Sequence, residues 1–435
     1  MNTESFLQYK RSPVFVWTDA LPNDDDSILY NLYGQIAYFR GQIFSMIPIG
    51  GNDTCVIDTN DDAYRGFRRM AAYSQGLVSR ASGSDLTEMH PGIAMAIRNA
   101  VHLATNDLID QCGYAPTYQT FFVDETLAIF HVYATGTNLT VVVNGPSRRP
   151  IQPSGSWNFG NTYIQRYDNA DKGNYLVTVQ SVANPPGPCA YRVIGNANTN
   201  AFIATANSLN TDMNTPYGFN PIYKVDNYMV AHINNFPVSY DQMSGLMAEM
   251  TVWTNESPNR TRTMVYASNG RYRDSCDYHF QFGSWKCPIP NMMFYAQIYV
   301  EDGTGYIMSR VVTGFCVTAQ HCFGDNCAGC QNGGVTNPAD NTTCLCPPGY
   351  TGTNCGNIIC QNGGTPNVYD CLCTDSWTGL FCEISKCITR DYDTPFTPNG
   401  KSLAVLVHNS LSTRGMIAKM SSNIAQTLQV KVVQN

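Results

Sequence analysis

Apolar positions in the first hundred residues follow two periods, one typical of buried strands and one typical of helices. Val14–Trp17 and Ile43–Ile47 are short continuous apolar runs, which predict strands. Helices are predicted after Asp24–Asp26, after Asp61, and from about Pro91, where apolar residues recur three or four positions apart. Alternating strands and helices predict an α/β layer with a parallel sheet. The three apolar helix faces are Ile28, Leu29, Leu32, Ile36 and Phe39; Tyr64, Phe67, Met70 and Ala71; and Ile93, Ile97, Val101, Ala104 and Leu108.

The pattern changes at about residue 116, where short strand-like runs alternate with turn signals such as Asn144-Gly-Pro and Asp171-Lys-Gly. Short strands at this spacing predict an antiparallel β-sandwich. Residues 209–315 repeat the style, and alternate positions of Phe294–Val300 give one apolar face. The strands expected in the first sandwich are Thr126–Ala134, Leu139–Val143, Tyr175–Val182, Tyr191–Ile194 and Ala201–Ala206.

Cysteine is concentrated near the C-terminal end, where twelve of the 17 cysteines lie between Cys316 and Cys387. This segment is rich in glycine and too poor in apolar residues to bury a core, so disulfides must hold it. A reducing cytosol would not maintain such bridges. The cysteine usage therefore predicts an extracellular or secreted protein.

Composition and charge narrow the range of partners. Charged residues make up only 14% of the chain and the formal net charge is −7, which disfavours nucleic acid and anionic membrane surfaces. No apolar stretch approaches the ~20 residues of a membrane span. The N-terminus lacks the apolar core of a signal peptide, which suggests that the chain is part of a longer precursor. Five sequons predict N-glycosylation, with Asn138 and Asn341 the expected acceptors: Asn52, Asn138, Asn255, Asn259 and Asn341.

Two internal repeats occupy the cysteine-dense segment. One begins Cys330-Gln-Asn-Gly-Gly and ends Pro-Gly-Tyr-Thr-Gly-Thr-Asn-Cys355; the other begins Cys360-Gln-Asn-Gly-Gly and ends Trp-Thr-Gly-Leu-Phe-Cys382. Both resemble epidermal-growth-factor-like modules. The resemblance implies bridges between the second and fourth and between the fifth and sixth cysteines of that family. Carried over, these are Cys330–Cys344, Cys346–Cys355, Cys360–Cys371 and Cys373–Cys382.

Both repeats depart from the growth-factor-like pattern. The family's third cysteine is absent after each Gly-Gly, so its first-to-third bridge is missing. The acidic stretch of the calcium-binding subset is also absent, which predicts calcium-independent modules. A zinc site at His321-Cys322…Cys327-Ala-Gly-Cys330 is the alternative, although the sequons favour oxidised cysteines.

The remaining cysteines give weaker expectations. Cys276 and Cys287 are close in sequence within the second predicted sandwich and are expected to bridge. Cys55 with Cys112 is a further candidate pair. Because 17 is odd, at least one cysteine, such as Cys189, is expected to be free or to pair between chains. The pairing stays open for Cys189, Cys316, Cys322, Cys327 and Cys387.

The first hundred residues resemble the second half of a von Willebrand factor A domain, most closely the branch in hemicentins. The likeness rests on Thr18-Asp-Ala after the first strand, on Ile43–Ile49 running into Gly50-Gly-Asn-Asp-Thr-Cys55, and on Tyr64–Gly76 followed by Leu77-Val-Ser79. In metal-binding members, Asp19 would be a ligand. Near the other end, His408-Asn-Ser-Leu-Ser412 lies where the family has Asp-x-Ser-x-Ser.

This resemblance implies only degenerate remnants of a metal site, namely Asp19, Ser410 and Ser412. Imidazole at His408 replaces the expected carboxylate, and Mg²⁺ prefers oxygen ligands. The two half-sites belong to opposite ends of the chain and would complement each other only if the ends met, which is not expected. The sequence therefore predicts no tight divalent-cation site, and no cofactor.

The hemicentin likeness continues into the two sandwiches, through Phe122-Val-Asp-Glu-Thr-Leu127, Val143-Asn-Gly-Pro146 and Tyr306-Ile-Met-Ser-Arg310. The fold class expected is multidomain α/β plus β. The expected domains are a C-terminal half of an A-type unit at 1–115, sandwiches at 116–208 and 209–316, growth-factor-like modules at 317–356 and 357–383, and the beginning of another A-type α/β unit at 384–435.

The sequence carries no recognisable catalytic motif: His-Glu-x-x-His, Gly-x-Ser-x-Gly and phosphate-binding glycine loops are all absent. The first functional hypothesis is a non-catalytic glycoprotein of the extracellular matrix or of cell adhesion, which binds proteins or glycans and associates with its own or other chains. The alternative is a soluble secreted recognition protein in host defence. A fragment of a processed enzyme precursor is the third.

Overall fold

The computed structural model of the 435-residue chain divides into two compact units. Unit 1 comprises 1–23, 39–197 and 396–435, and unit 2 comprises 24–38 and 198–395. Most of the described residues lie in β-strands. The structure describes residues 13–18, 36, 41–48, 62–82, 85, 100–108, 112, 117–184, 187–197, 199–206, 217–218, 221, 226–234, 247–254, 262–274, 277–288, 293–303, 305–316, 330, 335–336, 342–346, 349–367, 371–378, 381–382, 384–385 and 404–407.

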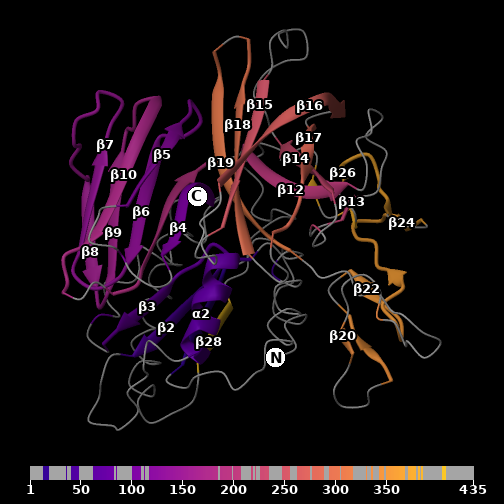
Figure 1. Cartoon of the computed structure of the whole chain (residues 1–435), viewed down its shortest axis with the longest axis horizontal. Helices are drawn as coiled ribbons and strands as arrows, with labels where there is room; N and C mark the ends of the chain where they lie inside the picture. The colour runs from indigo at the N-terminus through magenta and orange to yellow at the C-terminus, as the bar shows by residue number, and fades with distance from the viewer. Residues whose placement is uncertain are drawn as a thin grey trace, which may run out of the picture. The chain divides into compact units, whose positions relative to one another are not determined.

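Unit 1 contains a four-stranded parallel sheet in the order β28-β1-β2-β3 (Figure 1). The strands are β1 (Val14–Trp17), β2 (Ile43–Pro48), β3 (Val78–Ala81) and β28 (Ala404–Val407). β1 lies between two neighbours, which agrees with the continuous apolar run that predicted it. Segments from the two end regions of the chain do meet in this sheet, because Val14 pairs with Ala404 and Trp17 with Val407. The expectation that they would stay apart is therefore wrong.

Helix α2 (Asp62–Tyr73) packs on this sheet through one face. Tyr64, Phe67 and Ala71 lie three and four positions apart and pack with Ile47 of β2 and Val78 of β3. The helix is followed by a tight return into β3, in which Gly76 lies against the carbonyl of Ile43; a β-carbon on Gly76 would lie 1.8 Å from that oxygen.

The predicted last helix of the A-type unit is wrong, because residues 100–108 form strand β4 (Ala100–Leu108). β4 pairs antiparallel with β11 and belongs to the sandwich. Val101, Ala104 and Leu108 fit a helical spacing, but both faces of this strand are buried, so apolar residues occur without the period of two. The sandwich therefore begins well before residue 116, and the described elements do not support a von Willebrand factor A unit over 1–115.

The first sandwich packs a five-stranded antiparallel sheet, β4-β11-β6-β9-β8, against a three-stranded sheet, β5-β10-β7. Aromatic rings fill the space between them: Phe130 stacks on Tyr167 with ring centroids 4.8 Å apart, and Phe121 stacks on Tyr175 at 5.4 Å. The strands are β5 (Thr117–Val123), β6 (Ile129–Thr135), β7 (Leu139–Asn144), β8 (Gly155–Phe159), β9 (Thr162–Asp168), β10 (Gly173–Ser181) and β11 (Cys189–Asn196).

Close contacts join the parallel sheet to the sandwich within unit 1. The β8–β9 turn lies on β3, where the Arg80 backbone N–H donates to Asn161 Oδ1 at 2.6 Å and the Asn161 N–H donates to the Arg80 carbonyl at 3.0 Å. Gly160 adopts a φ of 54°, and a β-carbon there would lie 1.6 Å from the Arg80 oxygen. Only glycine satisfies both the backbone conformation and this contact.

Unit 2 contains an eight-stranded antiparallel sheet in the order β13-β12-β14-β17-β16-β15-β18-β19. The long strand β16 pairs with β15 through Arg262–Tyr266 and with β17 through Ala267–Asp274, so it links two halves of the sheet. Residues 201–206, expected in the first sandwich, instead form β12 of this sheet. The strands are β12 (Asn200–Ala206), β13 (Tyr217–Gly218), β14 (Asn227–Asn234), β15 (Met247–Trp253), β16 (Arg262–Asp274), β17 (Asp277–Trp285), β18 (Met293–Glu301) and β19 (Ile307–Phe315).

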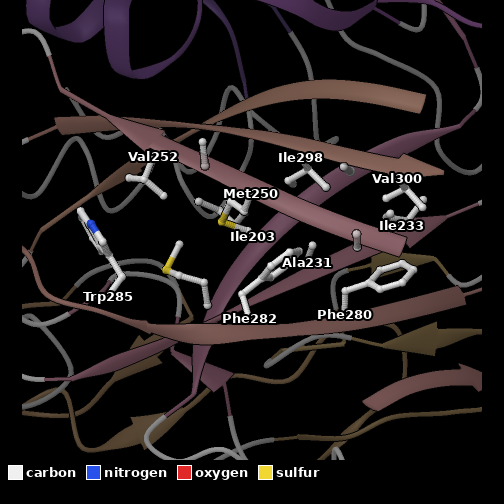
Figure 2. Close-up of a cluster of buried hydrophobic side chains, with 14 of the residues drawn as sticks. Ile203, Ala231, Ile233, Met250, Val252, Phe280, Phe282, Trp285, Ile298 and Val300 are labelled. Atoms are coloured by element: carbon white, nitrogen blue, oxygen red, sulfur yellow. The ribbon is translucent and has the colours of Figure 1, made fainter. Parts of the chain in front are cut away.

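Apolar side chains from both halves of this sheet meet in one core (Figure 2). Met250 of β15 and Ile298 of β18 lie with Phe282 of β17, and all three are fully buried. The alternation predicted for Phe294–Val300 holds, since Phe294, Ala296, Ile298 and Val300 all belong to this core. The two halves therefore form a β-sandwich-like body.

Four small hairpins follow in unit 2. They pair β20 (Val335–Thr336) with β21 (Cys344–Leu345), β22 (Tyr350–Thr351) with β23 (Asn357–Ile358), β24 (Thr365–Pro366) with β25 (Cys371–Leu372), and β26 (Trp377–Thr378) with β27 (Ile384–Ser385). No helix among the described residues is long and apolar enough to cross a membrane.

Candidate functional site

The cysteine-dense segment consists of two similar small modules. The structure joins the same four pairs that the growth-factor-like resemblance implies: Cys330–Cys344, Cys346–Cys355, Cys360–Cys371 and Cys373–Cys382. The bridge from Cys330 occupies the sulfur that the alternative zinc site would need. Each bridge closes a loop of 9 to 14 residues. By loop entropy alone each contributes about 2–3 kcal/mol, which is large for a module with almost no core.

The two modules share the same backbone hairpins as well as the same pattern of bridges. The first hairpin of each module contains its second cysteine, and the second hairpin is completed just beyond its last cysteine. The last cysteines, Cys355 and Cys382, have φ values of 59° and 58°. Non-glycine residues rarely adopt this left-handed conformation, so its recurrence at equivalent positions marks a true structural repeat.

The two modules are joined by an aromatic contact. Phe381 of the second module is fully buried, and its ring lies edge-on to Tyr350 of the first with centroids 5.1 Å apart. Gly349 also lies against the Phe381 ring, 2.5 Å from where its β-carbon would be. Burial raises the pKa of Tyr350 to about 12. These side-chain contacts connect the end of the second module to the first.

Two further bridges correct the weaker disulfide predictions. Cys112 bridges Cys189, not Cys55, and ties the segment after β4 to the start of β11. Cys287 bridges Cys316, not Cys276, inside the buried core of unit 2. Cys189 is thus not free. The sequence order gave no reason to pair residues 77 positions apart, because only the sheet brings them together. Cys55, Cys276, Cys322, Cys327 and Cys387 lie outside the described residues.

One glycosylation sequon falls within the described residues. Asn138 is exposed in the turn between β6 and β7, with a φ of 49°, and Thr140 of its sequon is also exposed. An acceptor asparagine must be accessible, so this position suits the modification. Asn52, Asn255, Asn259 and Asn341 lie outside the described residues.

The predicted remnants of a metal site lie outside the described residues, namely Asp19, His408, Ser410 and Ser412. The strands that precede them are described: β1 and β28 run parallel and end level, with Trp17 opposite Val407. Among the described residues, no group of three or more His, Cys, Asp or Glu side chains could hold a metal ion.

A cavity of about 380 Å³ lies in unit 1 between α2, the end of β3 and one end of the first sandwich. Tyr64, Arg68 and Ala71 reach it from one face of α2, and Val78 and Arg80 from one face of β3. The sandwich contributes two turns, the β6–β7 turn with Thr137 and Asn138 and the β8–β9 turn with Gly160 and Asn161. The rest of its wall is formed by Asp107, Tyr163 and the start of β11. Sequence reasoning missed this cavity because its walls come from segments far apart in the chain.

Two arginines and one carboxylate are the charged side chains that line the cavity. Tyr64 is buried and its burial raises the pKa of its hydroxyl, while the nearby guanidinium groups of Arg68 and Arg80 oppose that rise. Arg80 Nε is buried without a hydrogen-bond partner among the described residues. Asp107 is the one carboxylate in the lining, and Arg192 Nη2 holds it at 2.9 Å in a buried ion pair. Two guanidinium groups, one paired carboxylate and several hydroxyl and amide groups therefore line the cavity.

Three histidines have structural surroundings in the described part of the chain, namely His102, His131 and His232. His102 Nε2 lies 3.0 Å from Gln42 Nε2 and 3.2 Å from the Gln75 carbonyl, where it helps join β4 to the parallel sheet. His131 and His232 are buried within the two sandwiches. None of these three lines the cavity.

Comparison with known proteins finds a relative that aligns with nearly the whole chain. No family model matches the chain. The chain is 28% identical over 449 residues to "Protein irg-7" of Caenorhabditis elegans, an alignment that covers 99% of this chain and 20% of that protein. The chain thus spans about a fifth of the length of this relative.

Solved structures resemble the chain only distantly. A DUF4785 family protein of Legionella pneumophila aligns with 51% of this chain and 66% of its own, at 10% identity and a TM-score of 0.26. A GH2 β-galacturonidase of Eisenbergiella tayi aligns with 52% of this chain and 38% of its own, at 9% identity and a TM-score of 0.15. At these scores neither likeness carries an argument about fold or function.

Proposed function

We propose that the chain is part of a secreted, modular, non-catalytic glycoprotein that acts in the extracellular matrix or in adhesion by binding proteins or glycans. The observation that carries the proposal is the tandem pair of disulfide-held modules at Cys330–Cys382, which follows two sandwiches that each contain a buried bridge. Modules that depend on disulfides rather than on a core persist only where thiols stay oxidised. This supports an extracellular setting.

The shape of these modules also favours binding over catalysis. Short hairpins held by bridges expose most of their side chains, including the apolar residues Ile359 and Leu372. Catalysis requires convergent acid, base or nucleophilic groups within hydrogen-bond reach, usually inside a cleft. The modules offer accessible, rigid surfaces of the kind that recognition uses. We further propose that the modules belong to the growth-factor-like class.

The test is to secrete the chain from cultured insect cells behind a heterologous signal peptide and to compare the medium with the detergent-insoluble matrix. Matrix or adhesion function predicts retention in the matrix fraction, with all six bridges formed. Recovery in the medium alone would favour a soluble recognition protein instead. Retention inside the cells as a reduced, soluble chain would contradict the proposal.

A matched variant assigns any retention to the modules. Cys360→Ser with Cys371→Ser removes one bridge of the second module and leaves both sandwiches intact. If the modules bind the matrix, this variant is secreted but recovered mainly in the medium. A variant with Lys172→Ser, on the exposed surface of the first sandwich, should distribute as the parent chain does.

A further inference from the structure

We propose that the outer face of the three-stranded sheet β5-β10-β7 binds an uncharged, extended oligosaccharide, a β-1,4-linked chain of N-acetylglucosamine. The inference gives a ligand class to the glycan binding proposed above, and so rests on that proposal for its extracellular setting. It is carried by side chains of the first sandwich, none of which belongs to the disulfide-held modules.

Alternation along the three strands identifies the side chains of this face. The core between the two sheets takes every second residue, among them Phe121 of β5, Val177 of β10 and Val143 of β7. The residues between them therefore point away from the core. The outer face is defined by Tyr118, Thr120, Val142, Leu176, Thr178 and Gln180, each of which is exposed or partly exposed.

An exposed aromatic ring lies on this face. Tyr118 is 73% exposed, and strand pairing places it beside Thr178, which in turn lies beside Val142. The ring therefore begins a row that crosses all three strands. Such a ring offers an apolar surface on which the C–H face of a pyranose can stack, while its hydroxyl stays in water.

The other outer face of the sandwich is not available in the same way. Tyr133, Arg192 and Ile164 form a cross-strand row on the five-stranded sheet, and all three side chains are buried. The three-stranded sheet therefore carries the open face of this sandwich.

The face carries no charge, which determines the class of ligand. Strands β5, β7 and β10 contain no Asp, Glu, Lys, Arg or His. A charged ligand would lose hydration here without gaining a counter-charge, so the face favours an uncharged one. The hydroxyl groups of Thr120 and Thr178 and the amide of Gln180 can both donate and accept hydrogen bonds, as sugar hydroxyls do. The polarity of the face thus matches an uncharged glycan.

Apolar side chains between these polar ones favour an N-acetylated sugar. Leu176 lies beside Thr120, and Val142 lies beside Thr178, so methyl groups and hydrogen-bonding groups adjoin in both rows. An acetamide group joins a methyl to an N–H donor and a C=O acceptor, and can therefore use both kinds of side chain at once. The hydroxyl of glucose at the same ring position can use only the hydrogen-bonding groups.

The dimensions of the face suit an extended chain. Three strands span about 10 Å, and the outer residues from Leu176 to Gln180 span about 14 Å along β10. β10 pairs with a neighbour on each side, so the platform is fixed before a ligand arrives. A preformed surface loses little entropy on binding.

The test is isothermal titration of the secreted chain with the β-1,4-linked hexamer of N-acetylglucosamine. Cellohexaose, which lacks the acetamide groups, and the cationic hexamer of glucosamine at pH 6 are the controls. We expect the acetylated hexamer to bind at least about tenfold more tightly than either control, a factor that corresponds to ~1.4 kcal/mol.

A second preparation excludes competition by the chain's own glycan. Asn138→Gly removes the sequon that precedes β7 and keeps the positive φ of that position. A preference for the acetylated hexamer below tenfold in both preparations, or no binding in either, would overturn the inference.

Variants locate the binding on the face. Tyr118→Ala should weaken binding of the acetylated hexamer about tenfold, and Tyr118→Trp should restore it. Met247→Ala truncates an equally accessible side chain of unit 2, 61% exposed, and should leave binding unchanged. Thr120→Lys places a charge on the face and should weaken binding, whereas Thr351→Lys, at an exposed threonine of the first module, should not.

Thermal unfolding confirms that each variant is folded, as expected for replacements of exposed side chains. Undiminished binding by folded Tyr118→Ala and Thr120→Lys would overturn the site. A chain that is retained in the matrix but does not bind the acetylated hexamer would refute this inference and leave the proposed function standing. A chain that stays reduced inside the cells would refute the proposed function itself.

Discussion

At the scale of single residues, a few buried polar groups and glycines determine how unit 1 is assembled. Arg192 and Asp107 form an ion pair inside the sandwich, at the wall of the cavity. Gly160 allows the β8–β9 turn to lie directly on β3. Composition cannot reveal either feature, because an arginine or a glycine in the sequence looks the same whether it is buried or exposed.

Replacing the buried carboxylate of Asp107 should lower the free energy of unfolding of unit 1. Asp107→Asn leaves the Arg192 guanidinium buried without its counter-charge, and should destabilise unit 1 by about 3–5 kcal/mol. Glu125→Gln breaks the exposed pair with Lys172 and should cost at most about 1 kcal/mol. Urea unfolding followed by intrinsic fluorescence measures both. Equal costs for the two variants would show that the Arg192 pair is not buried.

Gly160→Ala should destabilise unit 1, because the new methyl group meets the Arg80 carbonyl and the backbone has a positive φ. A loss of roughly 2 kcal/mol or more is expected. Gly305→Ala is the matched control, since Gly305 also has a positive φ, of 90°, but no atom lies within 4 Å of the added β-carbon. Thermal unfolding should show the larger loss for Gly160→Ala. Similar losses would mean that backbone strain, not the contact with β3, explains the glycine.

At the scale of elements, sequence patterns predicted what depends on local order. The strands at Val14–Trp17 and Ile43–Pro48, helix α2 and the alternation in β18 follow from periodicity and from residues at their ends. Strand β4 was mistaken for a helix because it is buried on both faces and lacks a clear period. Strands β5, β8 and β9 were not predicted because polar residues interrupt their apolar positions, and pairing with neighbours decides their state.

The joint between the two modules gives a pH prediction. The folded modules favour the neutral form of Tyr350, since burial raises its pKa to about 12, above the ordinary tyrosine pKa of about 10. Tyrosines in the unfolded chain release their proton at lower pH, so this group's contribution to stability is full below pH 10 and falls as the pH rises from 10 to 12. The difference in ultraviolet absorbance between the parent chain and Tyr350→Phe, followed against pH, reports the titration of the Tyr350 hydroxyl. A midpoint near 10 would show that the hydroxyl is exposed.

The parallel pairing of β1 with β28 is testable by cross-linking. Val16 and Leu406 lie opposite each other, so cysteines at both positions should form a bridge within one chain. Moving the second cysteine to Val405 shifts it by one position out of register with Val16 and should prevent the bridge. Non-reducing electrophoresis distinguishes the outcomes. A covalent dimer in place of a compact monomer would mean that the strand comes from a second copy.

At the scale of the whole molecule, residues distant in the sequence create the features that the sequence alone could not predict. The sheet that contains both β1 and β28, the Cys112–Cys189 and Cys287–Cys316 bridges, and the cavity of unit 1 all depend on tertiary contacts. The module bridges were predictable because each lies within one short repeat and follows a known spacing. The metal-site remnants and four of the five sequons fall outside the described residues, so those expectations stay predictions.

The central claim is that this is an oxidised, modular chain built for the extracellular environment, and peptide mapping of the natively secreted protein under non-reducing conditions tests it most directly. After alkylation and digestion without reductant, mass spectrometry should recover six disulfide-linked peptide pairs: Cys112–Cys189, Cys287–Cys316, Cys330–Cys344, Cys346–Cys355, Cys360–Cys371 and Cys373–Cys382. Alkylated free thiols throughout the segment from Cys330 to Cys382 would contradict both the extracellular setting and the binding function proposed from it.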